Sequence, residues 1–292
     1  MAIPYNPTIS ELCRTALRRA GQPAPSNGQI GEAISQQFQE VKNDIKLVAG
    51  THPLLLANEV TVTIAGVQSY SQPSKANVVK SVLLYDGPSS WRGTLTAGNT
   101  TSLGFPSAID SVVSSTDMVG KTVFTLSGTG SLQWAYIYNY TSATALVSPT
   151  LATAASTDTV IQVCNYKEEL YDSSKQVINY LNYNFGVDRP IVGAMQGETF
   201  WLNCPPDKIY PLLWTYYKDI DQMDETDTDG LWTKILREWR SVFIEGVTAK
   251  SMVLYDDTRQ YDHMRVYQFM LNQLKSEALT IEQTVPYDPA FY

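Results

Sequence analysis

The chain has 292 residues, of which 43% are hydrophobic and 17% charged, and its formal net charge is −8. This length can bury a large core, and the acidic balance argues against a free-standing nucleic-acid clamp, because phosphate binding depends on Lys and Arg. We expect no membrane segment and no signal peptide, because no stretch approaches the roughly 18 apolar residues of a membrane span. The cysteines Cys13, Cys164 and Cys204 are scattered. We expect reduced thiols in a protein made in a cytoplasm.

Two amphipathic helices are predicted near the N-terminus. Thr8 and Glu11 form a capping box, and Gly21 ends the first helix. The second is expected over residues 29–48, since its apolar side chains recur at steps of three and four. These side chains are Ile30, Ile34, Phe38, Val41, Ile45 and Val48. Alternating apolar residues then predict a strand pair within residues 58–86.

The middle of the chain changes in composition. Of the 79 residues from 87 to 165, 26 are Ser or Thr and five are charged. Short β-type runs separated by Gly-rich turns predict a small antiparallel sandwich or barrel, inserted between the flanking segments. Residues 166–183 are then expected to form a helix. Strands at 199–204 and 210–217 follow, in a segment that ends at residue 228.

The C-terminal residues 229–280 predict a hairpin of two long helices with a corner at 255–257. Apolar residues recur on one side of each helix, so both can bury a face. In the first helix this side includes Trp239, Val242, Phe243, Gly246 and Val253; in the second it includes Met264, Tyr267, Leu271, Leu274 and Ala278. We expect Trp239 to lie in the core.

The predicted fold class is α+β. Long amphipathic helices from both termini form one bundle, and an antiparallel β sandwich or barrel is inserted between them. The segments are 1–57 (helical pair), 58–86 (strand pair), 87–165 (β module), 166–228 (helix, strand pair and acidic loop), 229–280 (helical hairpin) and 281–292 (extended tail).

An acidic loop precedes the hairpin. Its acids are Asp219, Asp221, Asp224, Glu225, Asp227 and Asp229. The loop either places negative charge at a helix N-terminus or presents an acidic surface to a channel or a basic partner. Its second half resembles the start of a calcium-binding loop, but the position that needs a bidentate carboxylate is Leu236, so we predict no metal.

The tail, residues 281–292, is interrupted by proline and rich in aromatic residues. We expect Tyr287, Phe291 and Tyr292 to dock on a neighbouring subunit or partner, because aromatic side chains carry much of the energy of interfaces. Elsewhere the chain offers little chemistry. It has only two histidines, His52 and His263, and lacks zinc-protease and phosphate-loop motifs. We therefore expect neither catalysis nor a cofactor.

The order of these parts resembles the head-to-tail adaptor proteins of tailed bacteriophages, including the podovirus type called tail tubular protein A. Four phrases carry the resemblance, together with the acidic loop and the helical hairpin. They are Ala16-Leu17-Arg18-Arg19-Ala20-Gly21, the helix ending at Val48, the turn from Gly66 through Tyr70 to Pro73, and Pro205-Pro206 before a Tyr-rich strand.

The resemblance implies a structural, non-enzymatic role in the virion neck, after assembly in the bacterial cytoplasm. Family members form a homo-oligomeric ring, usually twelvefold, between the portal protein and the tail nozzle or tube, and their β parts face the nozzle or the tail fibres. Viral DNA passes through such a ring without specific binding, and an acidic wall suits a conduit that must not hold phosphate.

Two other classes remain open. The Ser/Thr-rich module can hold a receptor or glycan on exposed Trp91 or Trp134, as in a receptor-binding tail protein. Alternatively, a carboxylate pair drawn from acids such as Glu168 and Glu198 can act in a cell-wall hydrolase.

Overall fold

A computed structural model describes residues 15–16, 18–19, 21, 37, 39–48, 50–52, 55–86, 91–106, 118–172, 186–219, 231–254 and 258–284. Within these residues the fold is mixed α+β: three antiparallel sheets occupy the middle of the chain, with one helix on the N-terminal side and two on the C-terminal side. The chain divides into two compact units. The first combines residues 1–56, 75–78 and 217–287, and the second holds most of the strands.

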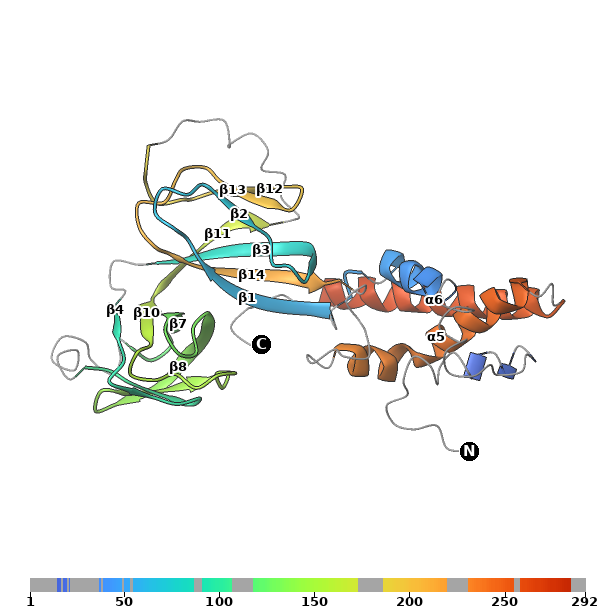
Figure 1. Cartoon of the computed structure of the whole chain (residues 1–292), viewed down its shortest axis with the longest axis horizontal. Helices are drawn as coiled ribbons and strands as arrows, with labels where there is room; N and C mark the ends of the chain where they lie inside the picture. Colours follow the sequence, from blue (N-terminus) through green and yellow to red (C-terminus); the bar gives the residue numbers. More distant parts are fainter. Residues whose placement is uncertain are drawn as a thin grey trace. The chain divides into compact units, whose positions relative to one another are not determined.

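The predicted C-terminal hairpin is confirmed by helices α5 (Leu231–Leu254) and α6 (Gln260–Thr284), which lie side by side in Figure 1. All residues from 242 to 249 of α5 are buried, so this part of the helix is covered on every side. A Cβ added to Gly246 would lie 2.6 Å from the Tyr267 ring and 2.9 Å from Val41. Glycine therefore permits the close approach of α5 to α6 and to the N-terminal helix.

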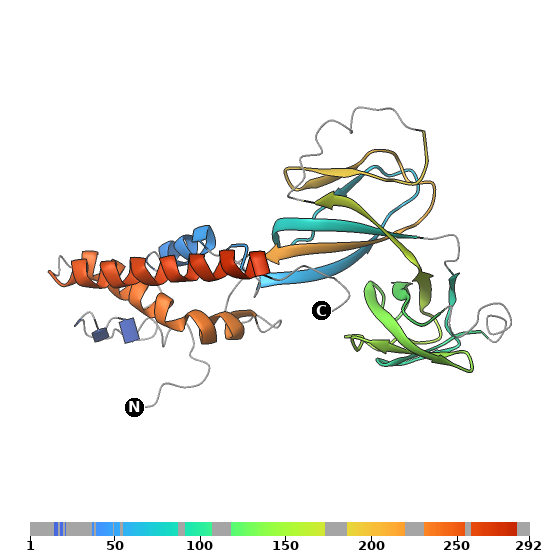
Figure 2. The same ribbon diagram turned by 180° about the vertical axis from the view of Figure 1, so that it is seen from behind.

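The N-terminal helix is described over residues 39–48, and both views show it beside α6 (Figures 1 and 2). Its Val41 and Ile45 are fully buried with Trp239 and Phe243, as the apolar stripe predicted. Ala16, one of four helical residues described in the first predicted helix, joins the same core. No long N-terminal bundle is shown within the described residues.

Two details of the predicted hairpin were wrong. Val253 is 51% exposed, because the apolar stripe turns away from the core at the end of α5. In addition, α6 continues to Thr284, so residues 281–284 are helical and do not belong to an extended tail.

A four-stranded sheet of order β1-β14-β3-β11 contains β1 (Leu56–Val62), β14 (Pro211–Lys218), β3 (Ala76–Asp86) and β11 (Tyr166–Asp172). The strands predicted within residues 58–86 and at 210–217 all lie in this sheet, but their predicted pairing is wrong. β1 and β3 do not pair with each other because β14 lies between them, and β14 does not pair with the strand at 199–202, which belongs to another sheet. The helix predicted over residues 166–183 is wrong for 166–172, where β11 pairs antiparallel with β3. Non-local pairing with a formed strand has overridden the local helical pattern. Residues 173–185 lie outside the described part of the chain.

A three-stranded sheet contains β12 (Gly193–Gln196), β13 (Thr199–Leu202) and β2 (Ser69–Ser71). Its first two strands form a hairpin, and the third comes from the turn phrase around Tyr70. The Tyr70 hydroxyl accepts a hydrogen bond from the Ile64 amide at 3.0 Å and donates one to the Val67 carbonyl at 2.7 Å. The tyrosine of this phrase thus closes its own turn.

A seven-stranded sheet is built entirely from the Ser/Thr-rich segment. Its order is β4 (Trp91–Thr94), β10 (Val160–Cys164), β7 (Thr122–Ser127), β8 (Gln133–Thr141), β9 (Thr144–Ser148), β6 (Ser102–Gly104) and β5 (Ala97–Gly98).

The two ends of this order are nearly consecutive in the chain. Between β4 and β5, the Leu95 amide donates to Thr159 at 3.0 Å and the Thr96 amide donates to Gly104 at 2.9 Å. The seven strands therefore surround one apolar core, which includes Leu103, Ile137 and Ile161. A second cluster, with Tyr85 and Phe124 at a ring distance of 4.6 Å, packs β7 against the four-stranded sheet.

We predict that Trp239→Ala lowers the free energy of unfolding by about 3–5 kcal/mol, since this side chain is 2% exposed and its removal leaves a large cavity. Its ring also meets His52 edge to face at 4.9 Å. Urea titration followed by circular dichroism measures the change. The matched control is Val253→Ala in the same helix, which should shift stability by less than about 0.5 kcal/mol. Equal effects of the two substitutions would contradict the core shown here.

Candidate functional site

The helical unit contains a buried carboxylate that joins three segments. Glu245 of α5 is 7% exposed. It contacts Nδ1 of His263 on α6 and lies 3.4 Å from Nη1 of Arg19. The sequence analysis named His263 without a partner, whereas the structure places its ring against the Glu245 carboxylate. Burying a carboxylate is costly unless it is paired, so these contacts fix how α5 and α6 face each other.

A second polar group ties the N-terminal helix to the hairpin. Lys250 of α5 lies 3.0 Å from Asp44 and 3.2 Å from Glu40. The Tyr267 hydroxyl of α6 donates to Asp44 at 3.1 Å. Burial first, and then the Asp44 charge, raise the pKa of Tyr267 well above its ordinary value. Both polar groups serve helix packing, and neither offers an open reaction site.

Of the acidic loop, only Asp219 is described. Its carboxylate lies 2.9 Å from Lys46, and its amide donates to the Lys75 carbonyl at 2.9 Å. This acid is therefore engaged within the helical unit. Asp221, Asp224, Glu225, Asp227 and Asp229 lie outside the described residues, as do the tail residues Tyr287, Phe291 and Tyr292.

The outer face of α6 carries large apolar side chains. Tyr261 is 77% exposed, Phe269 61% and Val266 43%. Tyr261 and Phe269 are eight residues apart, so they lie on one side of the helix, with Arg265 between them. We call these three apolar residues the α6 face. Such a row of exposed aromatic residues is typical of a surface that meets another protein.

The residues considered for glycan binding and for cell-wall hydrolysis are mostly engaged in packing or ion pairs. The Trp91 ring packs at 5.2 Å from Phe105, and Trp134 lies against the cluster between the sheets. Both rings are partly buried, so neither stands clear as a sugar platform. Glu168 is paired with Arg189 at 2.8 Å, while Glu198 is exposed in the turn between β12 and β13.

No group of three or more His, Cys, Asp or Glu residues that could hold a metal ion occurs in the part of the chain that the structure describes. Within that same part, no helix is long and apolar enough to cross a membrane.

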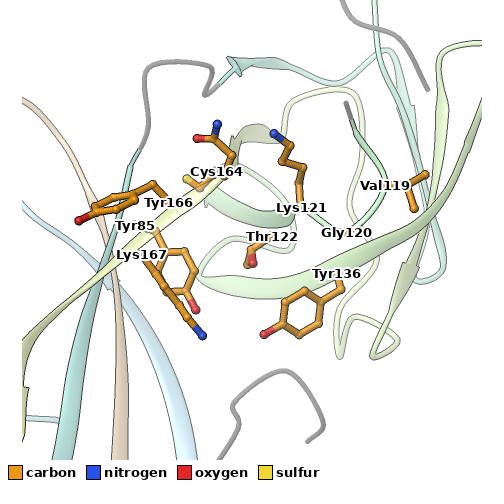
Figure 3. A pocket seen from close by; sticks show the side chains of 10 residues that line it. Tyr85, Val119, Gly120, Lys121, Thr122, Tyr136, Cys164, Tyr166 and Lys167 are labelled. Carbon is orange, nitrogen blue, oxygen red and sulfur yellow. The ribbon is translucent and has the colours of Figure 1, made fainter. Parts of the chain in front are cut away.

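A cavity of about 350 Å³ lies in the strand-rich unit, where β10 passes into β11. Figure 3 shows the side chains around it. Ten residues line it: Tyr85, Val119, Gly120, Lys121, Thr122, Tyr136, Cys164, Asn165, Tyr166 and Lys167. The sequence analysis missed this site, because its residues come from five different strands, from the turn before β7 and from the residue between β10 and β11. The local signals are a lysine just before β7 and another in β11.

The thiol in this cavity is not poised for reaction. Burial, followed by the nearby Asp86 carboxylate, raises the pKa of Cys164 from 9.0 to about 12. The thiol therefore stays protonated at neutral pH, whereas a nucleophilic cysteine needs a lowered pKa. Cys164 and Cys204 are both free and buried.

Comparison with known proteins adds no assignment: no protein-family model matches this chain, and no curated protein matches it.

We predict that the chain loses stability as the pH rises above about 9. Cys164 stays protonated in the folded chain up to about pH 12, whereas the unfolded chain releases this proton near pH 9. Above that pH the unfolded state binds fewer protons, so the free energy of unfolding falls, by up to about 1.4 kcal/mol per pH unit for this group. Urea titrations between pH 8 and 10.5 measure the slope.

The variant Cys164→Ala should reduce this slope without abolishing it, because burial also raises the pKa of Cys204. Its control is Val163→Ala, which removes apolar packing from the same strand and should lower stability equally at every pH. An unchanged slope in Cys164→Ala would show that this thiol is not the group responsible.

Proposed function

We propose that this chain is a structural head-to-tail adaptor, which forms a ring between the portal and the tail of a bacteriophage virion and performs no catalysis. The observation that carries the proposal is the union of the two ends of the chain. Residues 1–56 and 217–287 belong to one compact unit, whose core joins Val41 and Ile45 to Trp239 and Tyr267. The resemblance implies a helical bundle that lines or braces the channel of the ring, and this unit is the proposed bundle.

The order of the remaining elements supports the same proposal. The strand pair with the Tyr70 turn comes first, then the β module, then a strand that follows Pro205-Pro206, and finally the helical hairpin. In the proposed ring, each copy contacts the next through the α6 face. The portal and the tail nozzle or tube are the proposed partners. The tail fibres are proposed as further partners, which the β module would contact.

The net charge of −8 suits a passage for DNA. Twelve copies, the usual number in this group, would surround the duplex with a strongly acidic assembly. Repulsion between like charges then keeps the phosphates from binding to the wall. The proposed ring therefore conducts the genome without holding it.

The test is the mass of the purified chain by light scattering, with negative-stain imaging, alone and mixed with the portal protein of the same virus. Rings, formed alone or on the portal, are the expected result. A chain that stays monomeric under both conditions would overturn the proposal.

We predict that replacing both Tyr261 and Phe269 with Ser reduces ring formation strongly while leaving the fold intact, since both side chains are exposed in the single chain. Light scattering gives the assembled fraction, and thermal melting reports the fold. The matched control is Lys275→Ser, which shortens an exposed polar side chain on the same helix. Full ring formation by the double variant would exclude the α6 face as the subunit contact.

Removal of residues 285–292 should impair attachment to the portal without unfolding the chain. The cut follows Thr284, so it leaves α6 complete and takes away Tyr287, Phe291 and Tyr292. Co-sedimentation with portal rings measures attachment. A truncated chain that attaches as well as the full chain would remove the tail from the proposed contacts.

A further inference from the structure

We propose that the cavity beside β11 binds an acidic sugar residue, a saccharide that carries a carboxylate or a phosphate. This inference rests on the cavity alone and does not depend on the ring. The site lies within the strand-rich unit, and its volume of about 350 Å³ falls at the small end of the range for ligand pockets. One or two sugar rings match that size, whereas a polymer would need an open groove.

The walls of the cavity are fixed by strand pairing. Thr122 of β7 lies between its cross-strand partners Tyr136 of β8 and Cys164 of β10. Lys167 of β11 is the partner of Tyr85 of β3. Asn165 is the single residue that joins β10 to β11. Because neighbouring strands hold these side chains in place, a ligand meets a largely preformed site and little has to be ordered on binding.

The charge of the lining favours an anion. Lys121 and Lys167 contribute two ammonium groups, and none of the ten lining residues carries a carboxylate. Asp86, whose charge acts on the Cys164 thiol of the lining, is paired with Lys208 at 3.3 Å and with Arg189 at 3.7 Å. In a chain of net charge −8, this is a local surplus of positive charge around a hollow.

The neutral lining groups favour a sugar over a bare anion. Tyr136 and Tyr166 each combine a flat apolar ring with a hydroxyl, which suits the apolar face and polar edge of a sugar ring, whereas the buried Tyr85 ring packs on Phe124 and forms part of the wall. The Thr122 hydroxyl and the Asn165 amide can both donate and accept hydrogen bonds. In the view of Figure 3, Thr122 lies between Lys121 and Lys167. The Arg189 guanidinium lies 4.9 Å from the centre of the Tyr166 ring and holds that ring in place.

The same lining argues for binding without turnover. It contains no histidine and no carboxylate to act as acid or base, and its thiol remains protonated at neutral pH. Glu168, on the neighbouring position of β11, is paired with Arg189. The site therefore recognises its ligand and leaves it unchanged.

The test uses the full chain in calorimetric titrations with D-glucuronic acid, D-glucose 6-phosphate, D-glucose and inorganic phosphate. We expect at least one acidic sugar to bind about tenfold or more tightly than D-glucose, since a charged hydrogen bond is lost with the neutral sugar. The stronger of the two acidic sugars identifies the anionic group. Absence of binding by both, or phosphate binding as tightly as either, would overturn the proposal.

Substitutions locate the site. Lys121→Met and Lys167→Met should each weaken binding of the acidic sugar about tenfold, while Lys121→Arg keeps the charge and should bind more tightly than Lys121→Met. The matched control is Arg92→Met, which removes an exposed cation from β4, outside the cavity. Equal effects of the lysine and Arg92 substitutions would show that only overall charge matters and would refute the site.

A measurement on the unaltered chain avoids any folding defect of the variants. Acetylation of individual lysines is measured by mass spectrometry. Saturating acidic sugar should slow the acetylation of Lys121 and Lys167 and leave that of Lys208 unchanged. Lys208 is a suitable reference because its side chain is 54% exposed and lies outside the lining. Equal protection of all three lysines, or of none, would place the ligand elsewhere.

Discussion

The insertion of β14 between β1 and β3 is the constraint on which the strand-rich unit depends. This strand comes from near residue 214, yet its two neighbours both lie before residue 87. Its first seven residues are all buried, and the Trp214 indole donates to the Thr61 hydroxyl at 2.7 Å. β1 and β3 are joined only through β14, so this sheet can form only after the chain has continued for more than 120 further residues beyond β3. Pairing over such separations carries a large entropic cost, which the buried apolar strand must offset.

The helical unit follows the same logic with segments from the two ends of the chain. Its apolar core supplies most of the stabilisation, and two polar groups, around Glu245 and around Asp44, set the rotation and register of the helices. Apolar packing alone tolerates several helix arrangements of similar energy. Paired charges in the interior disfavour the wrong ones, because a shifted helix would leave Glu245 buried and unpaired.

The sequence was informative where structure depends on local pattern. The hairpin of α5 and α6 followed from apolar spacing sustained over two dozen residues, and the β-rich character of residues 87–165 followed from short alternating runs. The sequence misled at β11, because Leu170 fits a helical stripe as well as a strand, and only the presence of β3 decides between them. The sequence did not reveal the cavity for a related reason: Lys121 and Lys167 come to line one cavity through the order of the strands, which no local pattern records. The sequence did hold a signal for the buried Glu245. It lies in the apolar run Phe243-Ile244-Glu245-Gly246-Val247, and a charge inside such a run indicates a buried partner.

The pairing register at the end of β3 has a consequence for how chains of this fold can change in evolution. Asp86, the last residue of β3, is the direct cross-strand partner of Tyr166, the first residue of β11. The whole seven-stranded module therefore occupies the place of a hairpin loop, and a turn of about two residues could bridge the same gap. A module that brings its own core and leaves through adjacent strand ends can be gained, lost or exchanged without changing the strand order of the four-stranded sheet. Its loss would expose the residues of that sheet that pack on β7, such as Tyr85. Chains built on this plan should accordingly differ in length mainly at this junction.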